Sequence, residues 1–174
     1  MKLRTAAFVL LLPALAVAQA KLEFKTFTSK AHGFSVLLPA TPKEETAKLP
    51  SPFGELTIHA YLTETNDGKV AWIVTSSDYP AGTVKDENRD NILDGVVKGS
   101  AEGVKGKLLT QSKIALDKKY AGRSMQAEVP TTGIYHARVY LVGDRLYQIV
   151  VLGPKDVATG AEATKFLDSF KLVK

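Results

Sequence analysis

Residues 134–152 read IYHARVYLVGDRLYQIVVL, and this stretch decides the fold. Residues 134–142 and 146–152 are rich in Val, Ile, Leu and Tyr, the side chains that pack well on a pleated surface. Gly143 and Asp144 lie between them, and a two-residue loop with Gly first is typical of a type II′ turn, because that position needs a positive φ. Apolar side chains occur on both faces of residues 134–142, as in strands that are covered on both sides. The stretch therefore predicts a central antiparallel hairpin.

Segments upstream of this hairpin carry further strand patterns. Residues 55–63 alternate, with Leu56, Ile58, Ala60 and Leu62 on one face, which predicts a half-buried strand. Asp67-Gly68 is typical of a two-residue type I′ hairpin turn. The other predicted strands span residues 24–28, 34–38, 44–49, 70–76, 107–116 and 120–129.

Two segments have helical patterns. Residues 86–104 place an apolar stripe at three- and four-residue spacing. Thr159 and Glu162 fit a capping box that opens a closing helix, whose apolar residues are Ala163, Phe166, Leu167 and Phe170. The order of strands, helix, strands and helix predicts an α+β fold. We expect a mainly antiparallel sheet flanked by helices, an α/β/α sandwich, formed by a single domain over residues 21–174.

The first helical segment contains a row of glycines at four-residue spacing. Gly95, Gly99 and Gly103 each weaken a helix by up to about 1 kcal/mol relative to Ala. The row also gives the helix one flat edge, which predicts a close approach to the sheet. The charged flanks argue against a membrane dimerisation motif.

The N-terminus has the pattern of a secretory signal peptide. Lys2 and Arg4 precede an apolar run over residues 6–17, which is followed by Ala18-Gln-Ala20. The run is shorter than the roughly 20 apolar residues that span a bilayer. We expect cleavage after Ala20, an extracytoplasmic location (periplasm or secreted), and no membrane span in the remaining chain. Since the chain contains no Cys, it has no disulfide and no thiolate ligand.

The chain is mildly basic. Its formal net charge is +5, and without residues 1–20 it keeps 21 basic and 18 acidic residues, a net charge of +3. Much of the positive charge falls in one stretch: Lys98, Lys105, Lys107, Lys113, Lys118, Lys119 and Arg123. Such a stretch indicates either a solvated face or contact with an anionic envelope component. Nucleic acid is not an expected partner, because the chain is predicted to be exported and has no aromatic-basic stacking motif.

Motifs for catalysis and for cofactor binding are missing. The sequence has no Gly-x-Ser-x-Gly elbow, no phosphate loop, no His-Glu-x-x-His and no EF-hand loop. The sequence therefore predicts no catalytic residue, no cofactor and no metal site. The acidic residues of the first helical segment favour a capped, solvated helix start over a metal site, since carboxylates suit the positive end of the helix dipole. They are Asp86, Glu87, Asp90 and Asp94.

A few polar residues remain as candidates for a binding site. His32, His59 and His136 are far apart in sequence, although His59 and His136 both lie on predicted strands and could meet across the sheet. Two histidines without a third ligand are weak evidence for zinc. His136, Arg138 and Tyr140 share one strand face. If that face is exposed, these three residues are the interaction candidates; if a helix covers it, Arg138 reaches solvent over the helix.

Four segments together resemble a known structural group. They are Gly33-Phe-Ser-Val-Leu-Leu-Pro39, the central helix, residues 143–151 (GDRLYQIVV) and Phe166-Leu-Asp-Ser-Phe170. This pattern resembles the PsbP/Mog1-like α/β/α sandwich group, which includes an extrinsic photosystem subunit, a nuclear-transport factor and exported bacterial proteins. The resemblance implies a fold and a role as an accessory binding module, and it places no functional residue, since fold alone does not carry function.

Three functions remain open at this point. The first is an exported, non-catalytic binding or accessory module whose partner is a protein or an envelope component. The second is a carrier of a small apolar molecule or lipid in a cleft between sheet and helix. The third is an enzyme with an unrecognised site, which would need titratable residues with shifted pKa values in one cleft.

Overall fold

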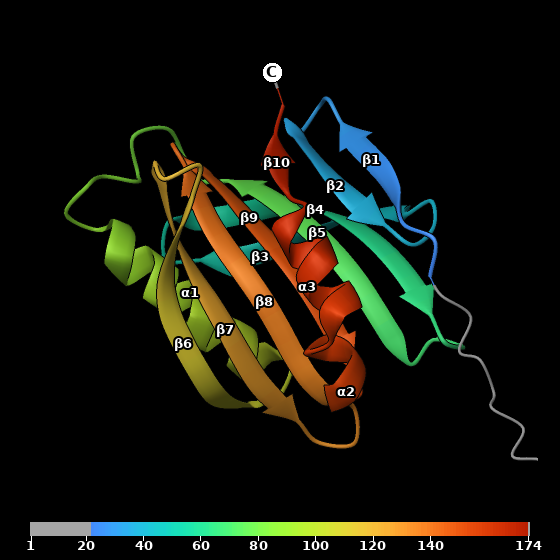
Figure 1. Cartoon of the computed structure of the whole chain (residues 1–174). Helices are drawn as coiled ribbons and strands as arrows, with labels where there is room; N and C mark the ends of the chain where they lie inside the picture. The colour runs from blue at the N-terminus through green and yellow to red at the C-terminus, as the bar shows by residue number, and fades with distance from the viewer. Residues whose placement is uncertain (1–21, 174) are drawn as a thin grey trace, which may run out of the picture.

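The computed structural model describes residues 22–173, and the predicted signal peptide with its cleavage site after Ala20 lies outside them. Two sheets are present in this part of the chain (Figure 1). Seven strands form an antiparallel sheet in the order β3-β4-β5-β9-β8-β7-β6, and three short strands form a second sheet in the order β1-β2-β10. The fold is α+β and mostly antiparallel sheet.

The elements follow one another along the chain with these bounds: β1 Lys25–Ser29, β2 Phe34–Leu38, β3 Lys43–Ser51, β4 Gly54–Thr65, β5 Val70–Asp78, α1 Arg89–Gly103, β6 Lys107–Leu116, β7 Tyr120–Val129, β8 Gly133–Val142, β9 Arg145–Gly153, α2 Lys155–Ala158, α3 Ala161–Asp168 and β10 Lys171–Leu172.

The hairpin of β8 and β9 is confirmed. Their register runs without interruption from Ile134 opposite Gly153 to Val142 opposite Arg145. Gly143 has a φ of 61°, as the first position of a II′ turn requires. The hairpin is flanked by β5 and β7, so both of its strands are interior strands of the sheet.

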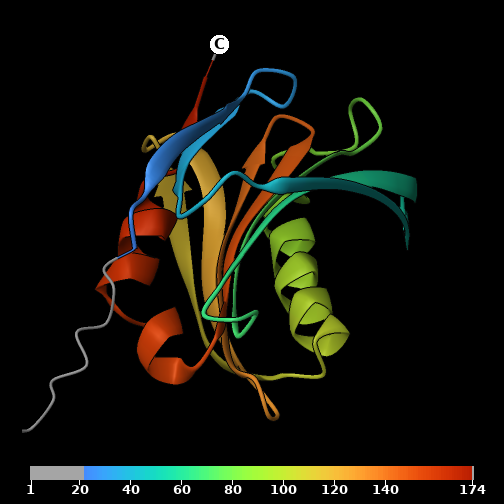
Figure 2. The same ribbon diagram turned by 90° about the vertical axis from the view of Figure 1, so that its right-hand side faces the viewer.

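Helix α1 covers one face of the seven-stranded sheet, and α2, α3 and the small sheet cover the other (Figure 2). On the α1 face, Val97 and Ala101 pack on small or slender side chains of β7 and β8, among them Met125 and Ala137. On the opposite face, Trp72 packs edge-on against Phe166, with ring centroids 5.5 Å apart. Both faces of the central hairpin are therefore covered, as its sequence predicts.

Two details of turn chemistry differ from the sequence-based expectation. The β4–β5 loop contains four residues, 66–69, because Thr65 pairs with Val70. Asn66 and Asp67 both have positive φ, which Asn and Asp tolerate better than most residues, so the turn starts before Gly68. The predicted capping box is also wrong: the N-cap of α3 is Gly160, and the Thr159 hydroxyl donates to the Lys155 carbonyl oxygen at 2.7 Å.

The entry to α1 also differs. The helix begins at Arg89 rather than Asp86, with Asn88 as the N-cap residue. The Asn88 side chain holds the preceding turn, because its Oδ1 accepts from the Lys85 N–H at 2.8 Å and its Nδ2 donates to the Thr83 carbonyl at 2.9 Å. In residues 22–173 no helix is long and apolar enough to cross a membrane.

Candidate functional site

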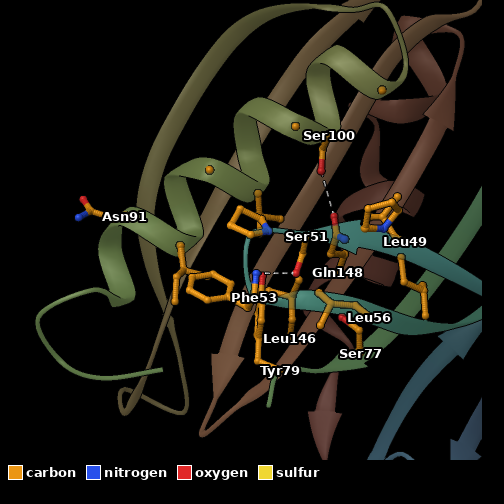
Figure 3. Close-up of a pocket in the computed structure, with 18 of the residues that line it drawn as sticks. Leu49, Ser51, Phe53, Leu56, Ser77, Tyr79, Asn91, Ser100, Leu146 and Gln148 are labelled. Carbon is orange, nitrogen blue, oxygen red and sulfur yellow. Dashed lines mark hydrogen bonds between the residues drawn. The ribbon is translucent and has the colours of Figure 1, made fainter. Parts of the chain in front are cut away.

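A groove runs between α1 and the β3–β4 hairpin, over the sheet face that α1 partly covers (Figure 3). Its volume is about 640 Å³. One wall is α1, the other is the hairpin, and the floor comes from the ends of β5 and β9. The lining residues are Asn88, Asn91, Ile92, Gly95, Val96, Gly99, Ser100 and Gly103 in the helix segment, Leu49 to Phe53, Leu56 and Ile58 in the hairpin, and Ser77, Tyr79, Leu146 and Gln148 in the floor.

The groove exists because α1 is too narrow for the sheet. The helix packs mainly on β7 and β8 and less on β6, and near its start Ile92 and Leu93 share a core cluster with Leu56 of β4. Strands β3 and β4 curve round towards the helix (Figure 2), which leaves a hollow between them and the helix. Leu56 and Ile58, on the predicted apolar face of β4, line this hollow.

The glycine row of α1 faces the groove, and the predicted close approach to the sheet is wrong. A Cβ added at Gly95, Gly99 or Gly103 would meet no atom within 4 Å. The edge of α1 that packs on the sheet instead carries Val97 and Ala101. The glycines therefore leave open space in the groove at three positions where a larger side chain would otherwise project.

Apolar side chains at the hairpin tip form the rim. Leu49 is 51% exposed and Phe53 is 39% exposed, two of the four large hydrophobic residues that the described chain exposes most. The Phe53 ring stands edge-on to Tyr79, with centroids 5.6 Å apart. The Tyr79 hydroxyl is neutral at pH 7, as tyrosine ordinarily is, and burial raises the pKa of Tyr79 further.

Polar groups in the groove are few and neutral. The Ser100 hydroxyl donates to Oε1 of Gln148 at 3.1 Å across the groove (Figure 3). The Ser51 hydroxyl is used within the hairpin turn, where it donates to the Gly54 carbonyl and accepts from the Phe53 N–H. No Asp, Glu, Lys, Arg or His occurs among the lining residues, although 24% of the chain is charged, so composition alone would place about four or five there.

Ion pairs behind the groove fix α1 on the sheet. Arg123 of β7 is 2% exposed, and it donates from Nε to Asp94 at 2.7 Å and from Nη2 to Asp90 at 2.8 Å. Lys113 of β6 also contacts Asp90, at 2.6 Å. Hydrogen bonds from Lys113 and Arg123 lower the pKa of Asp90 to about 2. Two of the four predicted helix-start carboxylates thus serve to dock the helix.

These contacts also divide the basic stretch of the sequence. Arg123 and Lys113 are paired with Asp90, and Lys98 lies 3.9 Å from Glu102. The remaining lysines, Lys105, Lys107, Lys118 and Lys119, lie near the two ends of β6. The stretch does not form a single unneutralised face.

The turn of the central hairpin holds the segment that leads into α1. The Asp144 carboxylate accepts from the Gly82 N–H at 2.8 Å and from the Val84 N–H at 2.9 Å. Its backbone carbonyl accepts from the Tyr79 N–H at 2.9 Å. The hydrogen bonds from the Val84 and Gly82 N–H groups lower the pKa of Asp144, and the one from Val84 has the larger effect. One end of the groove is thereby tied to the centre of the sheet.

The predicted interaction row lies on the opposite face of the sheet, beside α2 and α3. A His136 ring nitrogen, Nδ1, is 2.9 Å from the Ala158 carbonyl oxygen. Arg138 forms an ion pair with Asp168, and Tyr140 is buried with its ring stacked on Phe170. Helices cover this row, in which Tyr140 is buried and His136 and Arg138 are partly exposed. None of the three lines the groove, and their role in an interaction stays a prediction.

His59 and His136 are not neighbours, because β5 and β9 lie between their strands. His59 instead lies against His32 of the β1–β2 loop, with ring centroids 4.2 Å apart. Burial lowers the pKa of His32, and the nearby His59 lowers it further. In residues 22–173 no group of three or more His, Asp or Glu side chains is placed to hold a metal ion.

Comparisons with known proteins bear on the fold. No family model matches the chain, and no curated protein sequence does. The chain is similar to the solution structure of cyanobacterial PsbP (CyanoP) from Synechocystis sp. PCC 6803. That match has a TM-score of 0.59 and covers 89% of this chain and 95% of that chain, at 11% sequence identity. The chain therefore has a PsbP-like fold, as the sequence resemblance predicts, and the similarity carries no further than the fold.

Sequence reasoning offered a cleft between sheet and helix as one alternative but placed it on no residue. Two signals for it were present: a glycine row on an otherwise amphipathic helix, and Leu49 and Phe53 beside Pro50 and Pro52 in a turn. Neither signal alone locates a site, because both depend on where the hairpin lies relative to the helix.

Proposed function

We propose that this chain is a non-catalytic binding module that carries a small apolar molecule in the groove beside α1. The observation that carries the proposal is the groove itself, with about 640 Å³ of space between sheet and helix. Small-molecule sites have volumes of roughly 300–1,000 Å³, mostly apolar walls and a few fixed polar groups. Of the three functions left open by the sequence, the carrier has the most direct support.

The chemistry of the lining favours binding over catalysis. Ser51, Ser77 and Ser100 bring hydroxyl groups to the groove, and no imidazole or carboxylate lines it beside them. A serine nucleophile needs an adjacent base within hydrogen-bond reach to be activated. Tyr79 is the titratable lining residue, and its pKa is raised, away from the range of a base at neutral pH.

The proposal includes a location and a role. The signal-peptide pattern at residues 1–20 supports export, with Lys21 as the first residue of the mature chain. An accessory role in the cell envelope and an α/β/α sandwich arrangement are part of the proposal, and the apolar groove on the α1 side supports a binding role. Mass spectrometry of the protein from its own cells tests export: a mass that still includes residues 1–20 would contradict it.

The binding proposal is tested with Nile red, an uncharged dye that fluoresces in apolar sites. The wild-type protein is expected to bind one dye molecule. Gly99→Leu is expected to weaken binding at least tenfold, because the new side chain extends into open groove space. The matched control is Lys98→Leu, which adds the same side chain on an exposed helix position outside the groove and should bind normally.

Stability measurements separate blocked binding from unfolding. Replacing Gly99 removes a helix-interior glycine without a clash, so the variant should be as stable as wild type or more stable, by up to about 1 kcal/mol. Equal dye affinity in Gly99→Leu and wild type would refute the groove as the ligand site. So would an equal loss of binding in Lys98→Leu.

A further inference from the structure

We infer that the ligand of this groove is an uncharged single-chain molecule, a hydrocarbon chain with a neutral hydrogen-bonding end group. The hydrocarbon chain of the ligand lies lengthwise along the glycine edge of α1, and the ligand's polar end meets Ser100 and Gln148. This inference rests on the proposed function and adds the ligand's charge, shape and orientation.

The charge of the ligand follows from the lining. A carboxylate, phosphate or ammonium group taken into an apolar site needs a charged partner or several hydrogen bonds to replace its hydration. The groove offers neither Lys, Arg or His for an anion nor Asp or Glu for a cation. The ion pairs that fix α1 use Asp90 and Asp94, and neither residue is part of the lining. A charged ligand would therefore bind more weakly than its neutral counterpart.

The shape of the ligand follows from the dimensions. The lining positions on α1 run from Asn91 to Gly103, which at 1.5 Å per residue spans about 18 Å. An extended ligand can therefore follow the whole helix wall. An extended peptide would bring backbone N–H and C=O groups that need hydrogen-bond partners, and the polar groups lining the groove are few. A single hydrocarbon chain needs no such partners along its length.

The orientation follows from the placement of polar and aromatic groups (Figure 3). Ser100 and Gln148 meet across the groove towards the C-terminal end of α1. An amide and a hydroxyl can donate and accept, so they suit a neutral end group such as an amide, ester or alcohol. Phe53, Tyr79 and Ile92 line the other end, where the hydrocarbon tail would be buried.

The test is displacement of Nile red by three ligands with the same twelve-carbon chain: dodecanamide, dodecanoate and dodecylammonium. The neutral amide should displace the dye at a concentration at least tenfold lower than either ion. Along a series of amides from eight to twelve carbons, each added methylene should tighten binding about fourfold, from the free energy of burying one methylene. Equal displacement by dodecanoate or dodecylammonium would overturn the inference.

Variants and a peptide complete the test. Gln148→Glu should invert the preference, so that dodecylammonium displaces the dye better than dodecanamide. If Gln148→Glu does not fold, Ser100→Ala gives a second measurement. Ser100→Ala should weaken the binding of dodecanamide more than the binding of Nile red. A blocked, uncharged apolar decapeptide that competes better than dodecanamide would overturn the inference in favour of a peptide occupant.

The two proposals fail in different ways. If wild type does not bind Nile red, or if Gly99→Leu binds it equally well, the groove is not the ligand site and the proposed function fails. If the dye binds, Gly99→Leu abolishes its binding and the ions compete as well as the amide, the proposed function stands and the inference about ligand class is wrong.

Discussion

Arg123 shows how much one side chain contributes to the position of α1. Its guanidinium is 2% exposed, whereas the carboxylates it contacts, Asp90 and Asp94, are about half exposed. Such a geometry keeps the charge of Arg123 paired inside the protein while its partners stay partly hydrated. The groove wall depends on this contact, because Asp90 and Asp94 belong to the same helix as Gly95 and Gly99.

We expect Arg123→Met to lower the free energy of unfolding by about 1–3 kcal/mol at pH 7, since buried hydrogen bonds to charged groups are lost. Hydrogen bonds from Lys113 and from Arg123 hold the pKa of Asp90 at about 2 in the folded protein, below the ordinary 3.8, so Arg123 accounts for part of this shift. A lowered carboxyl pKa stabilises the fold above the ordinary value, and this contribution is lost as pH falls towards 2. The difference between variant and wild type in urea unfolding should therefore shrink from pH 7 to pH 2.5.

Lys113→Met is the control for this prediction. Lys113 contacts the same carboxylate from an exposed position, and surface ion pairs contribute about 0–1 kcal/mol. If Lys113→Met lowers the free energy of unfolding as much as Arg123→Met, the burial of Arg123 is not the cause of its larger contribution to stability.

At the scale of elements, local patterns were sufficient wherever a strand has near neighbours in sequence. Residues 107–116 and 120–129 are predicted and observed with the same bounds, because the pairing of two segments joined by a short turn is a local property. The capping box at Thr159 failed because the Pro154 turn starts a short helix first and uses Thr159 at its end. The position and lining of the groove could not be predicted, since they depend on how far β3 and β4 extend beyond α1.

The β8–β9 turn links the centre of the sheet to the segment before α1, and this link can be tested. Asp144→Ala removes the acceptor of the Gly82 and Val84 N–H groups. Both amides should then exchange hydrogen faster, while the Tyr79 amide, bonded to the Asp144 backbone carbonyl, should change little. Asp144→Asn keeps one acceptor oxygen and should leave one of the two amides protected. Unchanged exchange at Gly82 and Val84 in Asp144→Ala would contradict the link.

At the scale of the whole molecule, the two faces of the seven-stranded sheet differ in how completely they are covered. The face beside α2 and α3 is closed by aromatic packing that includes Trp72, Phe166 and Phe170. The face beside α1 is closed over β7 and β8, where Met125 and Ala137 are buried, and is open in the groove between α1 and the β3–β4 hairpin. Stability should therefore depend mainly on the closed face, and ligand binding on the open one.

The response to pH tests this division, because a titratable group, His136, lies under the closed face. Burial lowers the pKa of His136 below its ordinary 6.5, against the opposing effect of its hydrogen bond with the Ala158 carbonyl, and the positive charge of Arg138 lowers it further. Since the unfolded chain binds the proton more readily, the stabilising contribution is complete above about pH 6.5 and is lost as pH falls through the folded pKa.

We therefore expect the free energy of unfolding of wild type to decrease from pH 7.5 to pH 5, measured by urea titration. In His136→Gln, which keeps a donor for Ala158, this decrease should be smaller. The pKa of His32 is also lowered, so His32→Gln should remove a further part of this pH-dependent loss of stability. The free energy of unfolding of the double variant should then hardly decrease between pH 7.5 and pH 5. Nile red affinity should not follow the same pH profile, because neither histidine lines the groove. A wild-type stability that rises between pH 7.5 and pH 5 would show that protonation favours the folded state, the opposite of what burial of His136 requires.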